Sequence, residues 1–378
     1  MRVCPTCGEV YGDRAGRCRA HDVPLRDWAN PAETDPGLTT DVEGRRAETP
    51  FELHVVAGEI ANPTPRRRVS PLDATPLVVV DDAVARRRTP SGDRILGGRY
   101  RLSKQIGVGG YGAVFAGTDD LTGDRVAIKV LSPAAAQSSE MITRFHREAI
   151  AASRVRHRNI VDVTDFDVDI DGTQFIVMEY LDGCDLAETL DQTPVLAPAR
   201  ALAIAARCAR GLDAVHRVGI LHRDLKPANV FLVGADAIKI IDFGISKLTR
   251  AAGDYTDVTS ASKVVGTPCY MSPEQARGLE LDARSDVYGL GIMLYEMLVG
   301  ERPFTGRSPI EILAKHIDAP RVPPSSRRPE LAACPGLDAL VVTAVAVLPE
   351  RRYRSMAAFG DAIVACLRAI DPAAADRV

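Results

Sequence analysis

The sequence has 378 residues, of which 46% are hydrophobic and 26% are charged, with a formal net charge of -3 at pH 7. This composition suits a globular protein with more than one structural unit. It excludes a global basic field of the kind that draws a whole molecule onto nucleic acid or an anionic membrane. Arg greatly outnumbers Lys, a bias that indicates GC-rich, bacterial coding.

The chain shows no signal peptide and no apolar run long enough to cross a bilayer. Its longest apolar run, residues 339–348, predicts a buried helix. We therefore expect a cytoplasmic protein without membrane attachment. In that compartment the eight Cys residues serve as metal ligands or core residues rather than disulfides.

Residues 1–25 carry the pattern C-x2-C-x10-C-x2-H, formed by Cys4, Cys7, Cys18 and His21. Two such pairs on tight turns are typical of a small zinc ribbon, and metal binding would supply its folding free energy. Asp22 is a weaker candidate for the fourth ligand. The alternatives are a lone Cys pair in a disordered tail and a redox pair, although no βαβ pattern surrounds it. Acidic residues offset the basic ones here, so nucleic acid is an unfavoured partner and a protein is favoured.

Residues 26–98 contain eight Pro, scattered charges and no sustained periodicity, which predicts a flexible or polyproline-like linker. Two Arg triplets, at 66–68 and 86–88, precede Ser70-Pro71 and Thr89-Pro90. Such runs are usually solvated charge. A sharper hypothesis is that Ser70 and Thr89 are phosphorylated.

From residue 99 the pattern changes to alternating apolar residues that lead into G-x-G-x-x-G-x-V at residues 107–114. Dinucleotide-binding folds use similar glycines, but strand-like residues continue here and predict a β-hairpin whose backbone can approach phosphates. Lys129 follows on a predicted buried strand, where its charge requires a carboxylate partner. Glu148 is that candidate, on a predicted amphipathic helix over residues 138–155.

A strand over residues 175–181 and a helix over 198–218 lead to His222-Arg223-Asp224-Leu225-Lys226-Pro227-Ala228-Asn229, and then to Asp242-Phe243-Gly244. An Asp that orients a hydroxyl, with an Asn and a second Asp able to hold Mg²⁺, is the set that phosphoryl transfer from ATP requires.

With these motifs in this order, residues 100–367 resemble the Hanks-type (eukaryotic-like) serine/threonine protein kinases. The resemblance implies an α+β, bilobal fold with a β-rich small lobe, a helical large lobe and ATP between them. We therefore divide the chain into a zinc-ribbon-like segment (1–25), a disordered linker (26–98), a kinase domain (99–368) and a C-terminal tail (369–378). The first segment also resembles zinc ribbons that precede some bacterial kinases.

The resemblance assigns a role to each matching residue. Asp224 would orient the hydroxyl of a protein Ser or Thr and accept its proton, and Lys226 would contact the transferring phosphoryl group. The expected catalytic residues are Lys129, Glu148, Asp224, Lys226 and Thr267. The expected Mg²⁺ ligands are Asn229 and Asp242. The expected ATP contacts are Ile106, Gly107, Val108, Gly109, Gly110, Tyr111, Gly112, Ala113, Val114, Lys129, Glu179, Leu181 and Asp185.

An activation segment follows Asp242 and ends at residues 266–274, where Ser272 replaces the family's usual Ala. Glu274 is expected to pair with Arg352. Arg223 is a ready receptor for a phosphate on this segment. The candidate phosphosites are Thr256, Thr259, Ser260 and Ser262, with Thr259 preferred.

Ala228 and Cys269 replace positions where some members carry Glu, so a preference for Arg-containing substrates is not predicted. Two rivals to a protein kinase remain, a pseudokinase scaffold and a small-molecule kinase. The first normally lacks Lys129, Asp224 or Asp242, and the second lacks such an activation segment. The sequence predicts no oligomeric state.

Overall fold

The computed structural model describes residues 2–3, 10–11, 26–27, 94–109, 112–234, 237–242 and 268–378. The chain divides into two compact units, Met1–Pro76 and Leu77–Val378. In the first unit, β1 (Arg2–Val3) pairs in antiparallel fashion with both β2 (Val10–Tyr11) and β3 (Arg26–Asp27). The predicted zinc ligands Cys4, Cys7, Cys18 and His21 lie outside the described residues, as do the two linker phosphosites.

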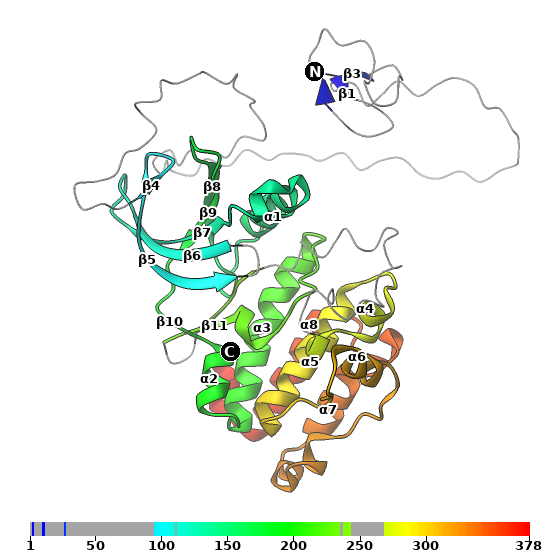
Figure 1. The fold of residues 1–378 in the computed structure, drawn as a ribbon. Helices are drawn as coiled ribbons and strands as arrows, with labels where there is room; N and C mark the ends of the chain where they lie inside the picture. The colour runs from blue at the N-terminus through cyan, green and yellow to red at the C-terminus, as the bar shows by residue number, and fades with distance from the viewer. Residues whose placement is uncertain are drawn as a thin grey trace, which may run out of the picture. The chain divides into compact units, whose positions relative to one another are not determined.

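The second unit begins with a six-stranded antiparallel sheet in the order β4-β5-β6-β7-β9-β8 (Figure 1). Its strands are β4 (Ile95–Leu96), β5 (Tyr100–Gly109), β6 (Gly112–Asp119), β7 (Arg125–Leu131), β8 (Val163–Val168) and β9 (Gln174–Glu179). Val126, Ala127 and Ile128 of β7 are buried in succession, which indicates that both faces of this strand are covered. The sheet holds Lys129 near the centre, between β6 and β9.

The helix α1 (Ser139–Ser153) covers one face of this sheet, after a short 3-10 turn, η1 (Ala135–Gln137). Ser138 caps its N-terminus by accepting a hydrogen bond from the backbone N–H of Met141. Phe145 and Ala149 pack with Leu131 in a small buried cluster. The predicted helix is confirmed, and this packing aims Glu148 at the sheet.

The rest of the second unit is mainly helical. Its helices are α2 (Leu186–Gln192), α3 (Pro198–Arg217), α4 (Pro273–Arg277), α5 (Ala283–Val299), α6 (Pro309–Asp318), α7 (Leu337–Ala344), α8 (Met356–Ile370) and α9 (Pro372–Asp376). Its 3-10 turns are η2 (Pro227–Asn229), η5 (Pro268–Tyr270), η6 (Pro324–Ser326), η7 (Pro329–Ala333) and η8 (Pro349–Arg351). The helix predicted over 198–218 is confirmed as α3. The predicted boundary at residue 368 falls inside α8.

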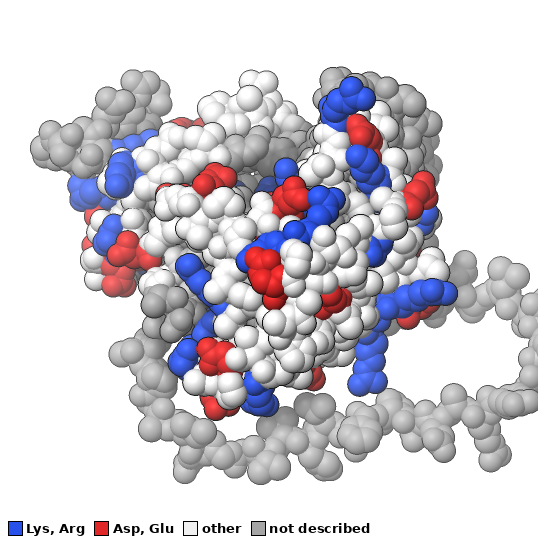
Figure 2. Space-filling model, turned by 90° about the horizontal axis from the view of Figure 1, so that it is seen from below, with Lys and Arg blue, Asp and Glu red and all other residues white. Residues whose placement is uncertain are grey.

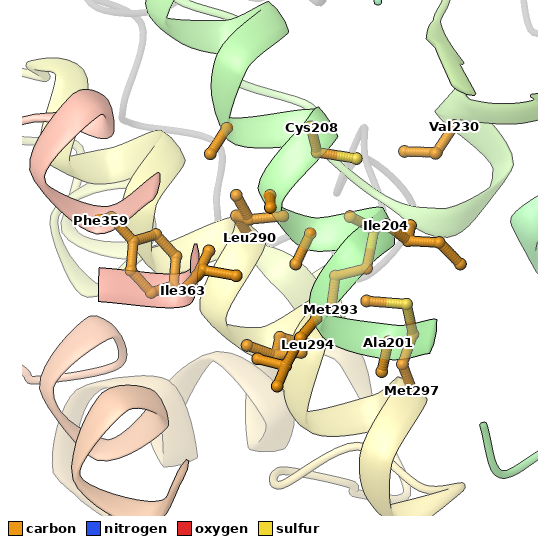
Figure 3. Close-up of a cluster of buried hydrophobic side chains, with 14 of the residues drawn as sticks. Ala201, Ile204, Cys208, Val230, Leu290, Met293, Leu294, Met297, Phe359 and Ile363 are labelled. Atoms are coloured by element: carbon orange, nitrogen blue, oxygen red, sulfur yellow. The ribbon is translucent and has the colours of Figure 1, made fainter. Parts of the chain in front are cut away.

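The core of this lobe lies where α3, α5 and α8 meet (Figure 3). Figure 3 shows Ile204 and Cys208 of α3, Met293 and Leu294 of α5, and Phe359 of α8 around one interior region. Nearly every residue of α5 is buried, so this helix lies in the interior and does not present one polar face to solvent. Asp282 caps its start and Gly300, with φ +85°, ends it. This helix is therefore the centre of the large lobe.

A second antiparallel sheet has the order β10-β11-β12, and Figure 1 shows β10 and β11 between the six-stranded sheet and the helices. Its strands are β10 (Gly183–Asp185), β11 (Val230–Val233) and β12 (Ala237–Ile240). Ile240 joins it to the segment between α1 and β8, because its N–H donates to Asn159 O (2.9 Å) and its C=O accepts from Val161 N (3.0 Å). The end of β12 is thus fixed against the small lobe just before Asp242.

On the face that Figure 2 shows, basic side chains are interspersed with acidic ones among the described residues. This agrees with the near-neutral composition. Within the described ranges, none of the helices has the length and apolar character needed to cross a membrane.

Candidate active site

Three charged side chains meet in the cleft: Lys129 on β7, Glu148 on α1, and Asp242, which follows β12. Lys129 Nζ lies 2.7 Å from Glu148 Oε1 and 2.8 Å from Asp242 Oδ1. The Lys129 and Glu148 side chains are 13% and 14% exposed, whereas that of Asp242 is 46% exposed. The predicted ion pair between Lys129 and Glu148 is confirmed, and Asp242 forms the open side of the cluster.

The electrostatics of this cluster favour a charged Asp242. Burial lowers the pKa of the Lys129 ammonium, but Asp242 and Glu148 outweigh it and raise that pKa above its ordinary value. Burial raises the pKa of Glu148. At Asp242 burial acts in the same direction, but Lys129 outweighs it and lowers the pKa of the carboxyl. The exposed member of the cluster therefore keeps its negative charge most firmly.

A small cavity that is partly open to solvent lies beside this cluster. Its lining residues are Lys129, Glu148, Ala149, Ala152, Val161, Val163, Ile176, Met178 and Asp242. Apart from the three charged groups the lining is apolar, which strengthens the attraction between them.

The segment around Asp224 is held by Asp286 of α5. One carboxylate oxygen of Asp286 accepts from the N–H of His222 and from His216 Nε2, at 2.8 and 2.7 Å, and the other accepts from the N–H of Arg223 at 2.8 Å. Burial raises the pKa of the Asp286 carboxyl, but these hydrogen bonds, above all the one with His216, outweigh burial and lower that pKa. The predicted catalytic segment is therefore fixed to the deeply buried helix α5.

Among the described residues, the positive φ values outside glycine are those of Arg223 (+65°) and Asp242 (+54°). Both belong to the predicted catalytic segments, one immediately before Asp224 and the other at the cluster with Lys129. Strained backbone of this kind persists where surrounding contacts over-determine it, and it is frequent at functional sites.

Lys226 and Asn229 lie close to Asp224. Lys226 Nζ is 3.3 Å from Asp224 Oδ2, and the amide of Asn229 donates to the backbone carbonyl of Asp224 at 2.8 Å. The N–H of Ile241 donates to Asn229 O at 2.9 Å, which places the chain at Asp242 beside Asn229. Amide and carboxylate oxygens, which the side chains of Asn229 and Asp242 carry, are ligands that Mg²⁺ accepts.

The predicted glycine-rich hairpin is formed by β5 and β6, with Gly107 opposite Val114 and Gly109 opposite Gly112. A Cβ at Gly112 would lie 2.0 Å from the carbonyl oxygen of Val130. Glycine at this position is therefore required by packing against β7, in addition to any approach of a ligand. Val108 is 80% exposed at the tip. Gly110 and Tyr111 lie outside the described residues.

Glu179 and Asp185, both predicted nucleotide contacts, have side chains engaged elsewhere. The carboxylate of Glu179 accepts from Lys239 Nζ at 2.5 Å and from the N–H of Asp162 at 2.8 Å. The carboxylate of Asp185 caps α2 by accepting from the N–H of Glu188 at 2.8 Å. The N–H of Glu179 is engaged as well, since it donates to the carbonyl of Asp162 at 3.0 Å, so neither its carboxylate nor its N–H is open to a ligand in this conformation.

The predicted pair of Glu274 and Arg352 is confirmed in the interior of the large lobe. The polar contacts that sequence reasoning missed include that of Asp286 with the backbone of His222 and Arg223, and that of Lys239 with Glu179. The signal for the first was an Asp at the start of a mostly apolar run. The second left no pattern beyond a lone Lys in a strand.

Several expected residues lie outside the described part of the chain: Thr256, Thr259, Ser260, Ser262 and Thr267. Within the described part there is no group of three or more His, Cys, Asp or Glu side chains arranged to hold a metal ion by themselves. The two predicted Mg²⁺ ligands do not form such a group. A Mg²⁺ site needs few protein ligands, because substrate phosphates and water usually complete the shell of the ion.

Comparisons with known proteins agree with this geometry. A family model described as the protein kinase domain matches residues 100–353. The serine/threonine-protein kinase PknB of Mycobacterium tuberculosis is 41% identical over 265 residues, which cover 69% of this chain and 42% of PknB. The serine/threonine-protein kinase pkn3 of Myxococcus xanthus is 39% identical over 280 residues, covering 72% of this chain and 51% of pkn3.

Among solved structures, the crystal structure of the Mycobacterium tuberculosis PknI kinase domain superposes with a TM-score of 0.56 at 31% identity. The match covers 72% of this chain and 97% of that domain. The present chain spans about half or less of the length of the curated relatives described above.

Proposed function

Because this chain belongs to the protein kinase family, we propose that it transfers the γ-phosphoryl group of ATP to Ser and Thr hydroxyls of proteins. The observation that carries the proposal is the convergence of Lys129, Asp224, Asn229 and Asp242 on one cleft. Its relatives are named as serine/threonine kinases, which argues against the alternative of a scaffold without catalysis.

In this proposal each residue acts through the geometry described above. Asp224 orients the substrate hydroxyl and accepts its proton, and Lys226, 3.3 Å from that carboxylate, neutralises charge on the transferring group. Lys129 is held by Glu148 and contacts the phosphates of ATP. Phosphoryl transfer needs mainly positioning and charge neutralisation, so these contacts supply most of what the protein contributes.

The donor set of Asn229 and Asp242 fits a magnesium ion, since both offer oxygen ligands and Asp242 is exposed and charged. When bound, Mg²⁺ would neutralise charge on the ATP phosphates. The proposed role of these residues is to fix where that neutralisation occurs. Asn229 is itself oriented by its hydrogen bond to the carbonyl of Asp224.

The test is transfer of labelled phosphate from ATP with Mg²⁺ by the purified chain, beside Asp224→Asn. Asp376→Asn is the matched control, because this carboxylate is 75% exposed on α9. We expect labelling by the wild type and the control, and none by Asp224→Asn. Measurable ATP binding without labelling in any of them would favour the scaffold alternative.

We further propose that a structural Zn²⁺ is bound by Cys4, Cys7, Cys18 and His21. The metal would stabilise a small ribbon that docks a protein partner or regulates the kinase. Metal analysis of the full chain should find about one Zn²⁺ per molecule. Cys4→Ser should lose that metal, whereas Cys334→Ser, a half-buried Cys in the second unit, should keep it. Equal zinc content in both variants would argue against the ribbon.

Autophosphorylation is proposed as the ordering switch of the activation segment, at Thr259 first and then at Thr256, Ser260 or Ser262. Arg223 would receive the phosphate. Sites mapped by mass spectrometry after incubation with ATP would locate it, and would also test Ser70 and Thr89. Full activity of the quadruple Ala variant would rule the switch out.

A further inference from the structure

The peptide group that joins Arg223 to Asp224 is hydrogen-bonded at both ends. Its N–H, on Asp224, donates to His222 Nδ1 at 3.3 Å. Its carbonyl oxygen, on Arg223, accepts from Gln275 Nε2 at 2.9 Å. The N–H of Arg223 itself donates to Asp286. Arg223 has φ +65°, so these bonds hold a conformation that its side chain disfavours.

Gln275 lies in α4, a single short helix that begins at the buried Ser272. The helix carries a capping box: the N–H of Gln275 donates to Ser272 Oγ at 3.3 Å, and Gln275 Oε1 accepts from the N–H of Ser272 at 3.0 Å. One side-chain amide therefore uses its oxygen on its own helix and its nitrogen on the segment that carries Asp224.

These two contacts require an amide at position 275. A flipped amide would place its NH₂ group against the N–H of Ser272 and its oxygen against the carbonyl of Arg223, so both bonds would be lost. A carboxylate could still complete the capping box, as Glu does in many helices. It could not donate to Arg223, so the two functions of Gln275 can be separated by one substitution.

The helix that carries Gln275 is held in place by buried polar contacts. The preceding residue, Glu274, forms two 2.7 Å contacts with the buried guanidinium of Arg352 and accepts from Ser285 Oγ at 2.7 Å. Gln275 and Asp224 line the same small cavity, together with Asp286 and Tyr270. A residue on a fixed helix thus contacts the backbone next to Asp224 across 52 residues of sequence.

We propose that Gln275 is a positioning residue for Asp224: its side-chain amide fixes the Arg223 carbonyl and so couples the end of the activation segment to the catalytic carboxylate. The inference rests on the proposed kinase function. It goes beyond it by assigning a role in the reaction to a residue outside the expected catalytic set.

The experiment compares the full-length wild type with Gln275→Glu, which keeps the capping box and loses the donor. Gln275→Met, which loses both contacts without adding charge, guards against misfolding of the first variant. The matched control is Ser355→Ala, because Ser355 caps α8 of the same lobe by accepting from the N–H of Ala358 at 3.2 Å. Steady-state kinetics with ATP and a protein substrate give kcat and KM for each.

Both Gln275 variants should lower kcat by about tenfold to a hundredfold, because small misplacements of a catalytic group have effects of that size. Their KM for ATP should stay within about twofold of the wild type, since the cluster at Lys129 is untouched. Ser355→Ala should leave kcat unchanged. Wild-type kcat in both Gln275 variants, or an equal loss in Ser355→Ala, would overturn the proposal.

Amide hydrogen exchange gives a readout that does not depend on activity. Exchange in the peptide covering residues 222–226 should be faster in both Gln275 variants than in the wild type, and unchanged in Ser355→Ala. Wild-type exchange there in both Gln275 variants would overturn the positioning role. An inactive wild type would instead contradict the proposed function, and the exchange result would still decide the contact between Gln275 and Arg223.

Discussion

Arg352 and Glu274 form a two-point ion pair in the interior of the large lobe, with Nη1 2.7 Å from Oε1 and Nη2 2.7 Å from Oε2. Their side chains are 0% and 6% exposed. Burial opposes ionisation of Glu274, but the hydrogen bonds and charge of Arg352 outweigh it and lower the pKa of the carboxyl. Arg352 also donates to three backbone carbonyls, so every N–H of its guanidinium group has a hydrogen-bond acceptor.

We expect Arg352→Met to destabilise the second unit by about 3–5 kcal/mol, because it leaves a buried carboxylate without its partner. Urea unfolding followed by circular dichroism measures this change. The control is Arg327→Met, whose pair with Glu301 is about half exposed on each side and should contribute at most about 1 kcal/mol. Similar urea midpoints for the two variants would show that the buried pair stabilises the protein no more than the exposed pair.

The second prediction concerns the two carboxylates that share Lys129. Lys129→Met should lower kcat/KM by at least about a hundredfold, because it removes the group that we propose contacts the phosphates of ATP. Glu148→Gln should cost less, about tenfold, since Asp242 still lies 2.8 Å from the ammonium. Kinetics with ATP and Mg²⁺ measure both losses. A larger loss in Glu148→Gln than in Lys129→Met would contradict this order.

The sequence was sufficient for contacts that follow a periodicity or a local rule. Strand spacing at Lys129 and helix spacing at Glu148 predicted their meeting. Ser272 was visible only as a replacement for Ala, yet it is the buried cap of α4. The role of Ser272 as a cap could not be predicted, because α4 has five residues and is too short to give a periodic signal.

The contacts that the sequence did not predict join a side chain to distant backbone. Asp286 accepts from Arg223 N across 63 residues, and Gln275 donates to Arg223 O across 52. Any buried Asp or Gln on a helix could make such a bond, so residue type and spacing do not specify its partner. The strained backbone at Arg223, which these bonds maintain, leaves no mark in composition either.

The third prediction concerns Lys239 and Glu179, which join the large and small lobes. Lys239 Nζ donates to Glu179 Oε1 at 2.5 Å and to the carbonyl of Ile160 at 3.2 Å. Lys239→Met should weaken ATP binding about threefold to tenfold, because the end of β9 and the strand before Asp242 lose a direct link. The modest size reflects side chains that are 20% and 31% exposed.

Isothermal titration calorimetry with ATP and Mg²⁺ measures this loss of affinity. Lys315→Met is the matched control, since Lys315 pairs with Glu311 at 2.8 Å within α6, on the large lobe alone. Equal affinities for ATP in the two variants would exclude a role for the link between the lobes.

The last prediction is a pH dependence of stability that arises at His316. This side chain is fully buried, its Nδ1 lies 2.8 Å from Tyr288 Oη, and its ring packs edge-on against Phe304. Burial, followed by the charge of Arg321, lowers the pKa of His316 to about 4. The unfolded chain therefore takes up a proton near pH 6.5 that the folded protein does not bind until about pH 4.

The contribution of His316 to stability is therefore complete above about pH 6.5 and is lost progressively as the pH falls toward 4, by up to about 3 kcal/mol. In His316→Phe the fall in unfolding free energy between pH 7 and pH 4.5 should be smaller by roughly 2–3 kcal/mol. The control is Phe304→Leu, which disturbs the same cluster without removing a titrating group and should lower stability by a constant amount at every pH. Urea unfolding at a series of pH values separates the two cases, because parallel curves for wild type and His316→Phe would mean that His316 is not the group that titrates.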